Sequence, residues 1–146
     1  MPTQSLLPAV ATDTDRLRLF CLPHAGGGLA SFFRWQRELP AGWSAQPVQL
    51  PGRDARRHDP PYNDVLALVS DLADEISVRV ERPYVVVGNS FGALVGFELL
   101  RELMRRRLSL PQLFVVAGFC APHVPRERLP IANLPPDELL AALQSR

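Results

Sequence analysis

The chain of 146 residues contains no lysine, only two cysteines and no long hydrophobic run. All 16 basic residues are arginine, and 15 acidic residues nearly balance them, so the formal net charge is +1. A charge this small gives no reason to expect a nucleic-acid partner. No segment approaches the roughly 18 consecutive apolar residues that a transmembrane helix needs. We therefore expect neither nucleic acid nor a membrane among the partners.

The N-terminus and the cysteines indicate a compartment. Residues 1–8 lack the basic region and the long apolar core of a secretory signal peptide. We interpret Cys21 and Cys120 as small apolar residues of strands, which fits a reduced protein interior. Neither has a further Cys or a suitably spaced His nearby, so we expect no metal site, and we expect no cofactor. These features favour the cytoplasm.

Apolar strand patterns alternate with helical patterns along most of the chain. The strand patterns cover residues 17–22, 44–50, 84–87 and 113–119, and the helical patterns cover residues 31–39, 64–80 and 91–107. This alternation predicts an α/β fold, with a parallel sheet covered by helices on both faces. We expect residues 1–15 to form a flexible arm and residues 16–146 to form one domain. A last short helical pattern begins at Asp137.

The segment Gly88-Asn89-Ser90-Phe91-Gly92 joins a strand pattern to a helical pattern. A G-x-S-x-G string at such a junction is typical of the nucleophile elbow of α/β-hydrolases. There the serine stands on a strained turn, and the glycines let the strand and the helix cross closely. The helix N-terminus then points its N–H groups at a developing oxyanion. The alternative interpretation is a glycine-rich turn with an ordinary serine at a helix start.

A second glycine-rich segment, residues 22–28, follows the first strand pattern and precedes the first helical pattern. In α/β-hydrolases a loop at this place supplies the second N–H group of the oxyanion hole. A phosphate-binding loop is the rival interpretation. However, the chain contains neither G-x-x-x-x-G-K-[ST] nor G-x-G-x-x-G.

Three segments in the same order resemble the type II thioesterases of polyketide and nonribosomal peptide synthesis. They are residues 20–27 (Phe-Cys-Leu-Pro-His-Ala-Gly-Gly), 49–53 (Gln-Leu-Pro-Gly-Arg) and 88–93 (Gly-Asn-Ser-Phe-Gly-Ala). The resemblance extends from about Arg16 to the last residue and includes residues 133–140, which are similar to the family's entry into its lid. It implies an α/β-hydrolase-type domain that is truncated after the strand following the nucleophile helix.

The resemblance also implies roles for individual residues. Ser90 corresponds to the nucleophile, and the backbone N–H groups of Ala25 and Phe91 correspond to the oxyanion hole. The implied substrates are acyl thioesters on the phosphopantetheine arm of acyl or peptidyl carrier proteins. Asn89 replaces the usual histidine of the family, but that side chain is not part of the triad.

The remaining triad residues are not recognisable in this chain. The triad of α/β-hydrolases follows the chain order Ser, Asp or Glu, then His. After Ser90 the only histidine is His123, and the only acids between them are Glu98 and Glu102 on the helix that leads away from the elbow. We expect His24 to bond within its own loop and His58 to be exposed. We therefore expect this chain by itself to be nearly inert.

Three functions fit these observations. The first is a serine thioesterase of which this chain carries the N-terminal portion. The second is a non-catalytic remnant that still binds carrier proteins. The third is another serine esterase or acyltransferase on the same fold.

Overall fold

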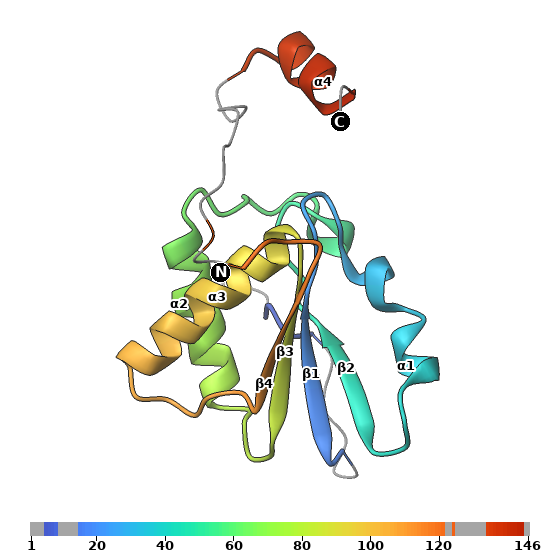
Figure 1. The fold of residues 1–146 in the computed structure, drawn as a ribbon. Helices are drawn as coiled ribbons and strands as arrows, with labels where there is room; N and C mark the ends of the chain where they lie inside the picture. The colour runs from blue at the N-terminus through green and yellow to red at the C-terminus, as the bar shows by residue number, and fades with distance from the viewer. Residues whose placement is uncertain (1–4, 9–14, 122–123, 125–133, 145–146) are drawn as a thin grey trace.

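The structure, a computed structural model, describes residues 5–8, 15–121, 124 and 134–144 (Figure 1). A four-stranded sheet with the order β2-β1-β3-β4 occupies its centre. All neighbouring strands are parallel. The strands are β1 (Leu17–Leu22), β2 (Trp43–Pro47), β3 (Tyr84–Asn89) and β4 (Leu113–Ala117). The α/β fold with a parallel sheet, predicted from the alternating patterns, is confirmed.

Helices cover both faces of the sheet, because successive side chains of a strand point to opposite faces. Phe20 of β1 belongs to the larger core cluster, which includes apolar residues of α2 and α3. Its neighbour Leu19 belongs to a second cluster with Phe32 and, partly buried, Trp35. Figure 1 shows α2 and α3 on one side of the sheet and α1 on the other. The elements are η1 (Leu29–Phe32), α1 (Trp35–Glu38), α2 (Val65–Ser77) and α3 (Phe91–Arg105).

Helix α2 shows how the sequence pattern produces the larger core. Asp64 caps the helix, because its carboxylate accepts a hydrogen bond of 2.9 Å from the N–H of Leu66. The side chains that recur at helical spacing are buried against the sheet and α3. Each fully buried leucine of this kind contributes about 2 kcal/mol to folding. The buried residues of α2 are Leu68, Val69, Leu72, Ala73 and Ile76.

The helix expected over residues 31–39 is wrong in its extent. The structure has instead the 3₁₀ turn η1 and the four-residue helix α1. Phe32 is buried and packs edge-on against Trp35, with ring centroids 5.5 Å apart, whereas Phe33 is exposed. A short, partly apolar segment of this kind covers one patch of the sheet without forming a long amphipathic helix.

Two strands are shorter than their apolar patterns predict. Strand β2 ends at Pro47; the N–H of Val48 still donates to the carbonyl of Cys21 at 2.9 Å, but the N–H of Gln49 donates to the carbonyl of Leu6 instead. Strand β4 ends at Ala117 because Gly118 follows with a φ of +61°, a left-handed conformation that turns the chain. Both strands end on the side of the sheet where the carboxyl ends of the parallel strands lie, and this side carries the candidate site.

Residues 5–8 are packed against the domain, so the expectation of a flexible arm is wrong for them. The side chains of Leu6 and Leu7 are only 2% and 1% exposed and belong to the larger core. The Glu75 carboxylate on α2 accepts from the N–H of Leu6 at 2.6 Å and from that of Leu7 at 3.2 Å. The carbonyl of Leu6 accepts from the N–H of Gln49 at 2.8 Å. The burial of two leucines, the Glu75 carboxylate and the Arg79 guanidinium, which donates to the Ser5 hydroxyl at 2.9 Å, hold this segment.

Helix α4 (Pro136–Gln144) matches the short helical pattern near the C-terminus and starts one residue before Asp137. Its assignment to a lid stays a prediction. None of the described helices is long and apolar enough to cross a membrane. Within the described residues, no group of three or more His, Cys, Asp or Glu side chains is placed to hold a metal ion.

We predict that the chain self-associates through β4. This strand is at one edge of the described sheet, and Leu113 and Val115 on it are 57% and 37% exposed. An apolar edge strand without charge is a pairing site, and one lysine on it discourages pairing. Light scattering should therefore detect oligomers that Val115→Lys reduces. The control Leu66→Lys, at an exposed leucine of α2, should change nothing. A monomeric protein with a high, reversible melting transition would contradict this prediction.

We also predict that Cys21 and Cys120 do not form a disulfide with each other. Strand β3 lies between β1, which carries Cys21, and β4, which precedes Cys120. Two strand spacings are about 9.5 Å, beyond the reach of a disulfide. Burial raises the pKa of the Cys21 thiol to about 12, so this thiol stays protonated in the folded protein. Titration without reductant should detect both thiols after denaturation, and Cys21 should not react before it. A denatured protein without thiols would contradict this.

Candidate active site

Ser90 lies alone in the turn between β3 and α3. Its φ of +52° and ψ of −111° are outside the regions that L-residues commonly adopt. The Ser90 N–H donates to the carbonyl of Ala117 at 2.8 Å, and its carbonyl accepts from the N–H of Ala93 at 2.9 Å. The strained strand-turn-helix predicted from G-x-S-x-G is confirmed. Strain of this kind persists only where the surroundings fix it, and it is common at functional sites.

The two glycines of the motif allow the close packing around this turn. A Cβ atom at Gly88 would lie 2.5 Å from the Cα of Ala93 in the first turn of α3. A Cβ atom at Gly92 would lie 2.1 Å from the carbonyl oxygen of Leu22 and 2.8 Å from that of Pro23. Both neighbours are backbone and cannot swing aside. The first turn of α3 therefore rests directly on the end of β1 and on the start of the loop that follows it.

The loop of residues 23–28, here called the glycine loop, folds back on itself. The N–H of Gly27 donates to the carbonyl of His24 at 2.9 Å. The Nδ1 of His24 donates to the carbonyl of Ala25 at 2.8 Å. The imidazole also covers Gly27, where an added Cβ would be 2.8 Å from its Nε2. His24 thus bonds within its loop, as predicted.

The other predicted site residues fall as follows. Among the described residues, neither the N–H of Ala25 nor that of Phe91 donates a hydrogen bond to a backbone carbonyl. The contact of Gly92 with Leu22 and Pro23 brings the glycine loop to the start of α3, from which Phe91 presents its N–H. His58 is exposed, as predicted. His123 lies outside the described residues.

The two glutamates of α3 are bound by arginines. The Glu98 carboxylate is 3.0 Å from Nη1 of Arg101, and the Glu102 carboxylate is 2.6 Å from Nη2 of Arg105. The hydrogen bond from Arg105 lowers the pKa of Glu102 below its usual value. These contacts lie along α3 and support the sequence-based view that neither glutamate serves as the acid of a triad.

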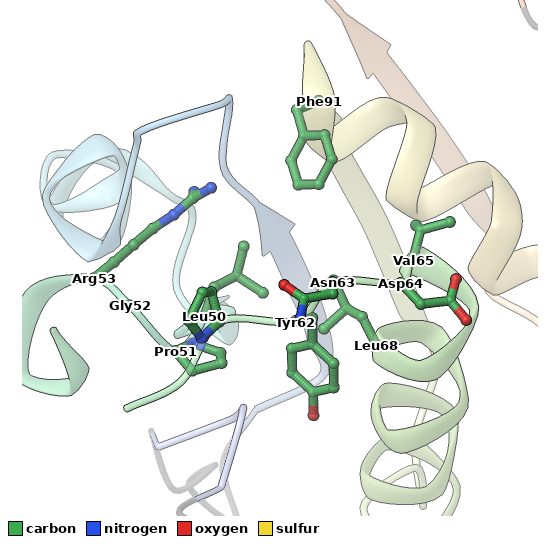
Figure 2. Close-up of a pocket in the computed structure, with 11 residues that line it drawn as sticks. Leu50, Pro51, Gly52, Arg53, Tyr62, Asn63, Asp64, Val65, Leu68 and Phe91 are labelled. Atoms are coloured by element: carbon green, nitrogen blue, oxygen red, sulfur yellow. The ribbon is translucent and has the colours of Figure 1, made fainter. Parts of the chain in front are cut away.

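A cavity of about 430 Å³ opens beside the turn and was not anticipated from the sequence. Figure 2 shows the ring of Phe91, the residue after Ser90, projecting from the start of α3 into it. The Tyr62 hydroxyl donates to the Asp71 carboxylate at 2.6 Å, and burial together with this bond raises the Tyr62 pKa to about 12. Most of the lining is apolar, and it includes Leu50, Pro51, Pro61, Tyr62, Val65 and Leu68. In the sequence, only the motif at residues 49–53 gave a signal for this cavity, because residues 50–53 form part of its wall.

A nucleophile-elbow geometry, a glycine-rich loop against it and a parallel α/β sheet together define the α/β-hydrolase type of fold. The family model described as a thioesterase domain matches residues 17–145. The chain therefore belongs to the thioesterase family. The resemblance to type II thioesterases that the sequence motifs indicate is confirmed by the similarity of this chain to type II thioesterases of polyketide and nonribosomal peptide pathways.

Three relatives document the similarity. The chain is 35% identical over 144 residues to the linear gramicidin dehydrogenase LgrE of Brevibacillus parabrevis, covering 99% of this chain and 55% of that protein. It is 34% identical, with a TM-score of 0.80, to the thioesterase RedJ of the prodiginine pathway in Streptomyces coelicolor, covering 94% of this chain and 53% of RedJ. The type II thioesterase YbtT of the yersiniabactin pathway is 33% identical, with a TM-score of 0.76 and coverages of 94% and 55%. This chain thus spans about half the length of these proteins.

The close packing of Gly92 predicts a large effect of a single methyl group. Gly92→Ala should lower the free energy of unfolding by about 3 kcal/mol, because its Cβ meets rigid backbone. Gly26→Ala is the control: Gly26 has a φ of +75° but open space around its Cα, so the substitution should cost only about 1–2 kcal/mol of backbone strain. Denaturant unfolding measures both values. Equal losses in the two variants would contradict the close approach.

Proposed function

We propose that this chain carries the nucleophile and oxyanion hole of a serine thioesterase. Its substrates would be acyl thioesters on the phosphopantetheine arm of carrier proteins, in editing or product release during polyketide or nonribosomal peptide synthesis. The observation that carries the proposal is the strained backbone of Ser90 between β3 and α3. Relatives named as thioesterases of such pathways support the substrate class. We propose the cytoplasm as the compartment, because the two cysteines fit a reduced interior.

The proposed reaction is an acyl transfer in two steps. The Ser90 hydroxyl attacks the thioester carbonyl while a histidine base takes its proton, and the N–H groups of Ala25 and Phe91 bind the oxyanion. Collapse of the tetrahedral intermediate breaks the C–S bond, and the pantetheine thiol leaves with the proton. Water then hydrolyses the acyl-serine ester by the same route. Each oxyanion donor contributes about 3 kcal/mol to such reactions.

The cavity beside Phe91 is suited to the apolar part of such a substrate. Its walls are mostly apolar, and it opens next to the residue whose N–H we assign to the oxyanion hole. The histidine base and its acidic partner are not assigned to any residue of this chain. Loss of the base of a hydrolytic triad lowers the rate on the order of a million-fold.

Two other functions are distinguishable from this one. A remnant that only binds carrier proteins would bind them without any hydrolysis that depends on Ser90. Another esterase or acyltransferase would prefer oxygen esters or a different acceptor. The name of LgrE denotes a dehydrogenase. The glycine loop of this chain, however, is not the G-x-G-x-x-G string of a dinucleotide site.

We predict that the isolated chain hydrolyses an acyl-pantetheine thioester barely above the uncatalysed rate. A continuation of the reading frame that supplies an Asp and then a His should raise the rate by several orders of magnitude, and Ser90→Ala should abolish the gain. Ser70→Ala on α2 serves as the control. Matched oxygen esters test the substrate class.

Rapid turnover by the isolated chain that both Ser90→Ala and His123→Ala abolish would show that His123 is the base. Turnover of the extended protein that survives Ser90→Ala would exclude Ser90 as the nucleophile.

A further inference from the structure

The glycine loop is tied to the next loop of the chain by two charged side chains. Nη1 of Arg53 donates to the carbonyl of His24 at 3.2 Å and to that of Gly27 at 2.6 Å. The Asp54 carboxylate accepts from the N–H of Leu29 at 2.8 Å. Three contacts from two consecutive residues therefore hold both ends of the glycine loop.

The contact of Arg53 with His24 determines the direction of a neighbouring N–H group. The carbonyl of His24 and the N–H of Ala25 belong to one peptide unit, which is planar and trans. Their bonds therefore point in opposite directions. Arg53 and the N–H of Gly27 both donate to the His24 carbonyl, so the Ala25 N–H must face away from them. The same reasoning applies to the Gly27 carbonyl and the Gly28 N–H.

Asp54 adopts a conformation that indicates a constraint. Its φ of +48° is left-handed, which is uncommon for a residue other than glycine. Its carboxylate fills the space beside Gly28, where a Cβ atom would lie 2.1 Å from Oδ2. The side chain is exposed, so its burial does not explain the strain. In this left-handed conformation the Asp54 carboxylate accepts the hydrogen bond from the Leu29 N–H.

The loop that carries Arg53 and Asp54 is itself anchored in the domain. Arg56 is only 3% exposed, pairs with Asp59 at 2.8 Å and donates to the carbonyl of Gln49 at 3.3 Å. Its N–H donates to the carbonyl of Arg53 at 2.8 Å. Figure 2 shows Arg53 reaching from the cavity wall toward the loop that follows β1. The tie therefore connects the glycine loop to a fixed part of the structure.

We infer that Arg53 and Asp54 are positioning residues for the oxyanion hole. Arg53 fixes the peptide unit between His24 and Ala25 and thereby the direction of the Ala25 N–H, which we assign to the oxyanion hole. Asp54 fixes the far end of the loop through Leu29. The inference concerns the order of the loop, and its catalytic consequence rests on the role proposed for Ala25.

Amide hydrogen exchange by NMR on the 146-residue chain tests the positioning. Arg53→Ala should accelerate exchange of the Gly27 N–H, and Asp54→Ala that of the Leu29 N–H, each by about tenfold or more, because each loses a charged partner of the loop. Asp54→Asn should restore protection, because the amide oxygen still accepts and asparagine tolerates a positive φ. Arg57→Ala, at an exposed arginine of the same loop, is the control. The melting temperature and the exchange of β1 and β3 amides should not change.

Unchanged exchange at Gly27 and Leu29 in the two alanine variants would overturn the inference, as would an equal change in Arg57→Ala. Ser90-dependent thioester hydrolysis, measured in the same variants on the extended protein, tests the consequence. We expect kcat to fall about tenfold or more, with KM changed less than about twofold, because an oxyanion donor acts in the transition state. If exchange responds but no hydrolysis depends on Ser90, the proposed function fails and the positioning stands.

Discussion

The contact of Gly92 with the carbonyl end of β1 is the constraint on which the arrangement of the candidate site depends. The backbone of α3 approaches the carbonyls of Leu22 and Pro23 more closely than any side chain would allow. Because Ser90 lies two residues before Gly92, the same contact leaves little freedom for the turn that carries it. The glycine loop starts at Pro23 and therefore begins against α3. One approach of two backbones thus brings together segments almost 70 residues apart in the sequence.

Arginine and carboxylate contacts fix the backbone of segments that have no regular secondary structure. Glu75 on α2 holds the backbone of Leu6 and Leu7. Arg56 lies almost fully buried under the loop after β2. Each of these charges contacts backbone groups, so it satisfies polar atoms that packing alone would leave without partners. Chain segments without regular secondary structure are thereby held at fixed places in the structure.

The two faces of the sheet differ in how completely they are covered. The face under α2 and α3 packs a continuous apolar cluster, which extends to Phe114 of β4. The smaller cluster under η1 and α1 contains residues of β1, β2 and β3. On the edge strand β4, Leu113, Val115 and Val116 are all exposed, so both faces of this strand are incompletely covered. The chain spans about half the length of its relatives, and it carries the part of the fold that holds the elbow and the glycine loop.

The sequence by itself determined the elements whose signals are local. Apolar runs bounded by glycine and proline located all four strands, and the helical spacing located α2 and α3. The motif around Ser90 predicted its turn, because Gly88 and Gly92 are needed wherever a strand and a helix cross this closely. These predictions succeeded because neighbouring residues contain the whole signal.

Only the tertiary structure decided the features that depend on distant partners. Nothing local in Ser5 to Pro8 indicates that Glu75, some 70 residues later, will bind this segment. The cavity beside Phe91 takes its wall from residues 50–53, 61–65 and 68, which no sequence period relates to α3. From the sequence alone, Arg53 and Asp54 would be interpreted as charged residues of the surface. Their bonds to His24, Gly27 and Leu29 follow from the way the sheet places two loops side by side, because adjacent parallel strands end at the same edge.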